Sequence, residues 1–329
     1  MCCSEVVKTL RLSREGYLAA GVATGFLPET LEKVVRLGEL LGLIFEHPFL
    51  RSQVLLKGGT AINLMPEAPR RLSVDIDLNY IGAIDRETML TEKPKVLDAL
   101  QRLAGGLGYG VVLRKGEHAG GGFVLNYSNS LGTPDRVEID ISFTNRVPLV
   151  APIECQIWQP DGVVRPLARL CAREELIAGK LCALVDRVAA RDVYDTTFLP
   201  ALADGPWPGK HQKRLFVFYS GSLNHPLHTY SADRLDPLSE QEVSSALIPM
   251  LSRKVVLDVE AMKENAKAIL SPMLTLDREE LEFVMALDTG ELQPDILFPQ
   301  DPELAGNLRK HPHLVWKAQN AKAHRKKLT

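Results

Sequence analysis

The stretch that decides the fold is "LLKGGTAINLMPEAPRRLSVDIDLNY", residues 55–80 of a 329-residue chain. It ends in a strand-like run in which Asp75 and Asp77 alternate with Ile76 and Leu78. Side chains two residues apart on a strand point to the same face, so the two carboxylates project together while the apolar residues face a core. Two carboxylates held this close repel each other, and a divalent cation between them removes the repulsion.

This pair predicts a site for Mg²⁺ or Mn²⁺. A hard cation such as Mg²⁺ is often bound by one or two carboxylates together with nucleotide phosphates. A third carboxylate would complete a two-metal site for displacement at phosphorus. The later run "RVEIDISF" offers Asp140, flanked by two isoleucines, with Glu138 as the alternative. We therefore expect Asp75, Asp77 and Asp140 to bind metal, although an isolated D-x-D is often only a solvated strand end.

A glycine pair precedes the strand and predicts a phosphate-binding turn. Gly58 and Gly59 would let backbone amides approach a phosphate closely, and a helix that begins after them would direct its N-terminal amides at the anion. Thr60 would add a hydroxyl and Lys57 a positive charge. A Gly-Gly pair alone is usually only a turn. The combination with the D-x-D strand is what favours a site for a metal-bound nucleotide.

The remaining patterns predict an α+β domain with a mixed sheet over residues 1–165 and a helical domain over 166–329. The turns of the first domain are expected at "HAGGG" and "NSLGTPD". Strands are predicted over 53–56, 72–79, 111–114, 123–126 and 136–143. Apolar residues at three- and four-residue steps predict helices over 27–45, 87–104, 173–190, 240–252, 258–270 and 278–287.

The composition is that of a soluble globular protein, with 45% hydrophobic and 24% charged residues. A net charge of −2 argues against a chain wrapped by nucleic acid, and we expect no DNA partner. The five cysteines include no C-x-x-C pair, which fits a reducing compartment. No run of about 18 apolar residues occurs, so we expect no membrane span and a cytoplasmic protein.

A second charged motif lies in "REELIAGKLCALVDRVAARDVYD", residues 173–195. Lys180 falls on the apolar face of the predicted helix, where it must reach water or meet an anion. Steps of seven and eleven residues place Arg187 and Arg191 roughly above it. We expect Lys180 and Arg191 to contact a triphosphate, and Asp192 to orient Lys180 or bind the acceptor. The alternative is a helix with solvated charges paired at i,i+4.

Together, "LKGGTAINL", "RLSVDIDLNY" and the lysine motif resemble the AbiEii/AbiGii toxin family, which includes the MenT-type toxins. The resemblance covers nearly the whole chain. It implies a nucleotidyltransferase of the polymerase-β-like superfamily, acting as the toxin of a bacterial toxin–antitoxin or phage-defence pair. Some relatives use a nucleoside triphosphate, CTP or GTP, to modify the 3′ acceptor end of tRNA and stop translation. The implied partners are an NTP, tRNA and an antitoxin encoded nearby.

The family's functional positions can be matched to this sequence. The resemblance implies that the turn at 58–60 holds phosphate and that Asp75 and Asp77 bind metal. Lys180 and Asp192 match later positions needed for activity. Ser73 matches a serine that is phosphorylated in some relatives to silence the toxin, and it is expected beside the nucleotide; a simple turn-capping role at the strand start is the alternative. The wider superfamily usually has Gly-Ser where this chain has Gly-Gly-Thr.

Other functions stay open at this point. The chain could keep the nucleotide pocket and act only by docking a partner. It could also transfer a nucleotidyl or phosphoryl group to a small molecule or to a protein hydroxyl. The presence of both aspartates, the lysine and the glycine turn favours catalysis, because a degenerate copy would usually lose one of them.

Overall fold

The chain divides into two compact units. The computed structural model describes residues 10–65, 68–114 and 120–328. The first unit consists of Met1–Thr144, Pro152–Leu170 and Ile248–Val256, and the second of Asn145–Ala151, Cys171–Leu247 and Leu257–Thr329. The boundary predicted at residue 165 falls short of the last strand of the first unit, Leu167–Leu170, which pairs within its sheet.

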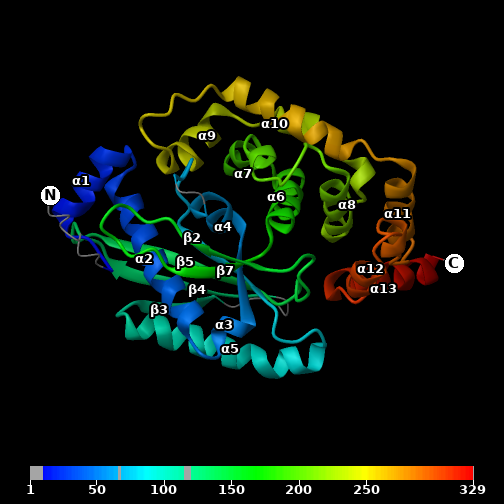
Figure 1. The fold of residues 1–329 in the computed structure, drawn as a ribbon, viewed down its shortest axis with the longest axis horizontal. Helices are drawn as coiled ribbons and strands as arrows, with labels where there is room; N and C mark the ends of the chain where they lie inside the picture. The colour runs from blue at the N-terminus through cyan, green and yellow to red at the C-terminus, as the bar shows by residue number, and fades with distance from the viewer. Residues whose placement is uncertain (1–9, 66–67, 115–119, 329) are drawn as a thin grey trace, which may run out of the picture. The chain divides into compact units, whose positions relative to one another are not determined.

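A seven-stranded sheet of order β3-β4-β5-β2-β1-β7-β6 forms the centre of the first unit (Figure 1). Its strands are Val54–Lys57 (β1), Asp75–Tyr80 (β2), Gly110–Arg114 (β3), Gly120–Ser128 (β4), Pro134–Ser142 (β5), Ile153–Gln156 (β6) and Leu167–Leu170 (β7). β2 is parallel to β5 and β1 to β7, whereas the other neighbours are antiparallel. The mixed sheet with helices confirms the predicted α+β class.

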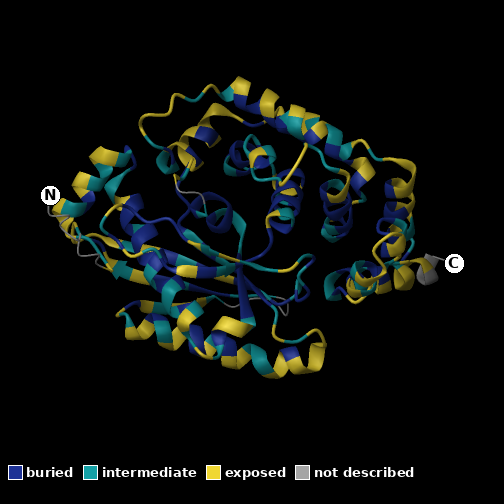
Figure 2. Ribbon diagram, in the orientation of Figure 1, coloured by how far each residue is buried: buried dark blue, intermediate teal, exposed yellow. Residues whose placement is uncertain are grey.

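One face of β2 belongs to the core. Ile76, Leu78 and Tyr80 are fully buried and point to this face. Helix α5 (Arg86–Gly106) covers it, since the Tyr80 hydroxyl donates a hydrogen bond to the Glu92 carboxylate of α5. Figure 2 shows α5 buried towards the sheet and exposed on its outer side. The side chains of Asp75 and Asp77 therefore project from the opposite face.

The other helices of the first unit are α1 (Arg14–Thr24), α2 (Pro28–Glu46), α3 (Leu50–Gln53) and α4 (Gly58–Leu64). α2 and α5 confirm the helices predicted over 27–45 and 87–104. Two turn predictions need correction. The helix expected to begin after the glycine pair begins at Gly58 itself. Of "HAGGG", residues 118–119 lie outside the described residues, and the three glycines form the first residues of β4.

A short segment, Ile248–Val256, returns to the first unit after a long excursion; we call it the strap. The N–H of Leu72 donates to the carbonyl of Met250 at 2.8 Å, and Arg71 forms an isolated antiparallel bridge with Leu251. The N–H of Arg253 donates to the carbonyl of Gly25 at 2.8 Å. The strap therefore fixes the backbone just before β2.

The second unit is helical. Ring centroids of Phe218 and Phe283 lie 5.9 Å apart in its core. Its helices are α6 (Arg173–Arg187), α7 (Ala190–Thr196), α8 (Lys210–Tyr219), α9 (Glu240–Ala246), α10 (Val259–Leu274), α11 (Arg278–Asp288), α12 (Pro302–Leu308) and α13 (Pro312–Leu328). α10 and α11 confirm two predicted helices, whereas the helix predicted over 240–252 ends at Ala246 because the strap follows.

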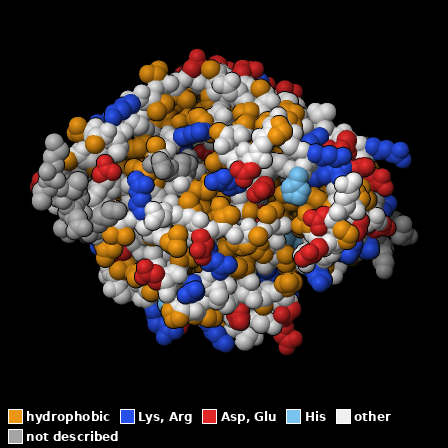
Figure 3. Space-filling model, viewed as in Figure 1, with side chains coloured by type: hydrophobic (Ala, Val, Ile, Leu, Met, Phe, Trp, Pro, Cys, Tyr) orange, Lys and Arg blue, Asp and Glu red, His pale blue; other side chains and the backbone are white. Residues whose placement is uncertain are grey.

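Charged side chains of both signs are interspersed on the face drawn in Figure 3. That face carries no large patch of one sign, in keeping with a net charge of −2. Among residues 10–65, 68–114 and 120–328, no helix combines the length and the apolar character needed to cross a bilayer.

Candidate active site

Asp77 lies directly against the first residue of α4. Gly58 has a φ of +71°, and a Cβ placed on it would lie 2.3 Å from Oδ2 of Asp77. Only glycine meets both constraints without strain. Lys57, the last residue of β1, stands opposite Asp77 in the antiparallel register. The half-buried carboxylates of Asp75 and Asp77 thus share a sheet face next to backbone that carries no side chain.

Gly59 lies against two side chains from the segment before β2. A Cβ on Gly59 would lie 3.0 Å from the hydroxyl of Ser73 and 3.1 Å from Nη2 of Arg71. Both side chains are buried, with exposed fractions of 5% and 2%. The guanidinium of Arg71 also donates to the carbonyl of Leu72 at 2.9 Å. The structure therefore places Ser73 and a buried cation against Gly59, and the contact of Ser73 with nucleotide stays a prediction.

The hydroxyl of Thr60 has a structural contact. Thr60 is fully buried and donates to the backbone carbonyl of Asp75 at 2.5 Å. This hydrogen bond, rather than the predicted one to a phosphate, is what the structure shows for this residue. Thr60 therefore fixes the start of α4 against β2.

The third predicted metal ligand stands beside the pair but has another partner. Asp140 is in register with Asp77 on the parallel neighbour strand β5, and Glu138 with Asp75. The guanidinium of Arg114 forms ion pairs with both Glu138 and Asp140. Within the described part of the chain, no group of three or more His, Cys, Asp or Glu side chains is arranged to hold a metal ion. The predicted triad is not assembled here, because Arg114 holds the third carboxylate.

The remaining pair fits one divalent cation. Asp75 and Asp77 are half-buried, share one face, and lie beside a backbone turn that has no side chain to fill the adjacent space. Two carboxylates with room for phosphate oxygens are the set that Mg²⁺ accepts in nucleotide-dependent enzymes. The pair could therefore hold the cation without a third protein ligand.

In the second unit, two carboxylates hold Lys180. Its ammonium lies 2.8 Å from Oδ1 of Asp192 and 2.8 Å from Oδ2 of Asp195, and all three side chains are buried. Nε of Arg187 donates to Oδ2 of Asp192 at 2.7 Å. Burial acts to raise the pKa of Asp192, but the positive charges of Lys180 and Arg187 outweigh burial and lower that pKa below its ordinary value. An ionised Asp192 therefore orients the ammonium of Lys180, one of the two roles predicted for it.

Arg187 lies on the helix of Lys180, as predicted, and shares its partner Asp192, whereas the predicted continuation of that helix to Arg191 is wrong. α6 ends at Arg187 because Val188 adopts a left-handed φ of 49°, and α7 begins at Ala190. Along a continuous helix, Asp192 would lie about 18 Å from Lys180. The break turns α7 back so that its acidic side chains reach Lys180. Arg191 lies half-buried in the first turn of α7, and its contact with nucleotide stays a prediction.

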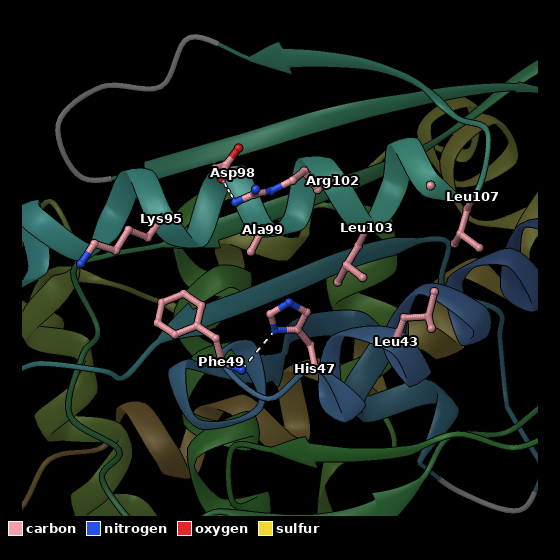
Figure 4. Close-up of a pocket in the computed structure, with 10 residues that line it drawn as sticks. Leu43, His47, Phe49, Lys95, Asp98, Ala99, Arg102, Leu103 and Leu107 are labelled. Carbon is pink, nitrogen blue, oxygen red and sulfur yellow. Dashed lines mark hydrogen bonds and ion pairs between the residues drawn. The ribbon is translucent and has the colours of Figure 1, made fainter.

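A separate cavity of about 790 Å³ opens in the first unit between α5, the end of α2 and the short segment that follows α2 (Figure 4). The imidazole of His47 points towards α5, and its Nδ1 accepts the N–H groups of Phe49 and Leu50 at 3.1 and 3.2 Å. The lining is Leu43, His47, Phe49, Lys95, Asp98, Ala99, Arg102, Leu103, Gly106 and Leu107. Because α5 covers the core face of β2, this cavity lies away from the face of Asp75 and Asp77.

A family model described as "Nucleotidyl transferase AbiEii toxin, Type IV TA system" matches residues 40–283, more than half of the chain. The chain belongs to the AbiEii family. The matched range includes both the carboxylate pair of β2 and the Lys180 cluster. The predicted recognition as an AbiEii nucleotidyltransferase toxin of a toxin–antitoxin system is therefore confirmed.

The fold of this AbiEii protein is similar to a solved structure of MenT4, a nucleotidyltransferase toxin from Mycobacterium tuberculosis H37Rv. The two share 19% sequence identity with a TM-score of 0.64, over 91% of this chain and 99% of that chain. At this identity the likeness concerns the fold, and it confirms the nucleotidyltransferase architecture with C-terminal helices. A search of curated protein sequences gives no match.

Sequence reasoning missed three side chains of this AbiEii protein's candidate site. Asp195 was not selected, although its three-residue spacing from Asp192 places both on one face of a helix. Arg71, which with Arg70 could meet triphosphate or RNA, carries no sequence signal for its burial against Gly59. Arg114 carried no signal, because its importance depends on the pairing of β3, β4 and β5.

Proposed function

We propose that the chain transfers a nucleotide from an NTP to RNA, at the 3′ acceptor end of tRNA, and thereby blocks translation. One observation carries the proposal: Asp75 and Asp77 share a sheet face, and the carboxylate of Asp77 abuts Gly58 at the start of α4. Membership of a nucleotidyltransferase toxin family supports the reaction class. CTP or GTP is the proposed donor, by resemblance to relatives.

Asp75 and Asp77 would hold a Mg²⁺ or Mn²⁺ ion. When bound, the metal supplies positive charge that neutralises the triphosphate. The glycines at 58 and 59 leave the backbone open to phosphate oxygens, and Arg71 and Lys57 provide further positive charge in the same unit. Burial and the hydrogen bond to Leu72 restrict the Arg71 guanidinium, so it is positioned before the substrate binds.

The transfer itself breaks one phosphoanhydride bond. A terminal ribose hydroxyl of the acceptor attacks the α-phosphorus and releases its proton to solvent, a new phosphodiester forms, and pyrophosphate leaves with the displaced electron pair. Lys180 would supply a fixed positive charge to the triphosphate, since Asp192 and Asp195 hold its ammonium in place. Asp192 would act as a positioning residue through Lys180.

The family also suggests the biological setting. A type IV toxin implies a cognate antitoxin as partner, and we propose phage defence as the role of the pair. Transfer RNA and nucleoside triphosphates are cytoplasmic, so we propose that the chain acts there.

The test is incubation of the purified chain with Mg²⁺, total bacterial tRNA and each NTP labelled at its α-phosphate. We expect label at the tRNA 3′ end from one NTP. Asp75→Asn keeps the side-chain shape and should abolish the label. Asp98→Asn, an exposed carboxylate on α5, is the matched control and should label tRNA normally. Unlabelled RNA from an active toxin would reject the RNA acceptor, and label on protein or a small molecule would favour those alternatives.

A further inference from the structure

Five strands contribute one residue each to a row across the face that carries the carboxylate pair. The register aligns Lys57 with Asp77, Asp77 with Asp140, Asp140 with Gly122, and Gly122 with Arg114. Residues opposite each other on neighbouring strands point to the same face. Arg114 of β3 therefore stands on the same face as Asp77 of β2.

Arg114 reaches across one strand to contact the next. Nη1 lies 2.9 Å from Oε2 of Glu138, and Nη2 forms an ion pair with Oδ1 of Asp140. Neighbouring strands are about 4.8 Å apart, so the guanidinium must pass above β4 to reach β5. The residue beneath it is Gly122, whose Cβ would lie 2.7 Å from Oδ1 of Asp140 and 3.1 Å from Nη2 of Arg114. A glycine at this position makes the ion pair possible.

The ion pair of Arg114 and Asp140 has a defined geometry, but a divalent cation can compete with Arg114 for the Asp140 carboxylate. A guanidinium stays charged at every physiological pH and binds two carboxylates through its fork of donors. The side chains of Arg114 and Asp140 are 39% and 52% exposed, so solvent screens their attraction. A divalent cation that used Asp140 would have to displace Arg114 and would stand next to its positive charge.

We propose that Arg114 is a positioning residue that withholds Asp140 from the metal, so that Asp75 and Asp77 bind the cation tightly only together with nucleotide phosphates. The inference rests on the proposed function, because it concerns the same metal site. Two protein carboxylates give Mg²⁺ an incomplete set of ligands, and the triphosphate supplies the rest. Arg114 thereby makes metal binding conditional on the nucleotide.

The test is titration of the full-length chain with Mn²⁺. The electron paramagnetic resonance signal reports the concentration of free Mn²⁺ at each point of the titration. Each titration is run without nucleotide and with a non-hydrolysable CTP or GTP analogue. Without nucleotide, we expect Arg114→Gln to bind Mn²⁺ about tenfold more tightly than the wild type, since a freed carboxylate joins the site. Arg114→Met should behave in the same way, and thermal melting checks that each variant is folded.

Two further variants separate the explanations. Arg136→Gln is the matched control, because Arg136 pairs with Glu138 at 3.2 Å rather than with Asp140, and its substitution removes the same charge. It should leave Mn²⁺ affinity unchanged, and Arg114→Gln combined with Asp140→Asn should lose the gain. Equal affinity in wild type and Arg114→Gln, or an equal gain in Arg136→Gln, would overturn the inference. Failure of the wild type to bind Mn²⁺ even with nucleotide would instead reject the proposed metal site.

Discussion

The ammonium of Lys180 lies 2.8 Å from a carboxylate oxygen of Asp192, although twelve residues separate them in the chain. The contact exists because Val188 ends α6 in a left-handed conformation and lets α7 turn back. Asp195, one turn further along α7, reaches the same ammonium. The position of the lysine is therefore set by a break in the helix rather than by helical periodicity.

Removal of Lys180 should destabilise the protein. Lys180→Met leaves the carboxylates of Asp192 and Asp195 in the interior, where their side chains are 1% and 0% exposed. We expect a loss of about 3–5 kcal/mol in the free energy of unfolding at pH 7, the cost of breaking a buried ion pair. Urea unfolding measures it. Lys267→Met is the matched control, since its partners Asp236 and Glu264 are over half exposed, and it should leave the free energy of unfolding nearly unchanged because solvent screens the pair.

Lys180→Met should also reverse the pH dependence of the free energy of unfolding. In the wild type the pKa of Asp192 is lowered, so its stabilising contribution is present above the unfolded pKa of about 3.9 and is lost as pH falls through the folded pKa. In Lys180→Met, the buried carboxylates should have raised pKa values and take up protons on folding. Its stability should then increase as pH falls from 7 to 5. A destabilisation that is constant between these pH values would contradict the explanation.

Gly58→Ala should damage both stability and activity. A residue other than glycine at a φ of +71° costs about 1–2 kcal/mol, and the new Cβ would displace the carboxylate of Asp77. Gly59→Ala is the paired control, because its backbone has no positive φ and its closest contact would be 3.0 Å from the Ser73 hydroxyl. Gly58→Ala should have a lower melting temperature than Gly59→Ala and should label much less tRNA. Equal behaviour of the two variants would show that Asp77 does not need the space beside residue 58.

Val188→Gly should stabilise the protein. Valine is branched at Cβ and is strained at a φ of 49°, whereas glycine adopts this conformation freely. We expect a gain of about 1 kcal/mol, measured by urea unfolding, with tRNA labelling retained. Val188→Ala keeps an L-residue at the same φ and should give no gain. A loss of stability in Val188→Gly would mean that packing of the half-buried valine outweighs the strain.

His311 should make the protein sensitive to acid. Burial, with the positive charges of His313 and Arg146 nearby, lowers the pKa of His311 from 6.5 to about 3, and within the described part of the chain neither ring nitrogen has a hydrogen-bond partner. Its stabilising effect is complete above pH 6.5 and falls as pH drops towards 3, by about 1.4 kcal/mol per pH unit. His311→Phe should flatten this slope between pH 6 and 4, measured by urea unfolding. His228→Phe, at an exposed position, should leave it unchanged.

Local patterns predicted the elements that place the carboxylate pair. The alternation around Asp75 and Asp77 identified β2, and apolar periodicity identified α2 and α5. The short strands β6 and β7 were not predicted, because four residues carry too little periodicity. Their strand character comes from pairing with each other and with β1.

Tertiary contacts decided the features that could not be predicted. "HAGGG" has a composition typical of a turn, yet Gly122 is in a strand that pairs with β3 and β5, and its lack of a side chain leaves room for the ion pair of Arg114 and Asp140. Val188 has neither glycine nor proline next to it to signal the end of a helix. The break is compensated by the buried cluster of Lys180, Asp192 and Asp195. Both features depend on residues distant in sequence.

The strap has a consequence for synthesis of the protein. Domains generally fold from the N-terminus as the ribosome releases the chain, but the first unit is incomplete without Ile248–Val256. A nascent chain that ends before residue 248 lacks the backbone partners of Arg71 and Leu72. The ribosome must therefore release most of the helical unit before the backbone ahead of Asp75 is fixed. A cell that makes this toxin thus holds an unfinished nucleotidyltransferase unit until late in each round of translation.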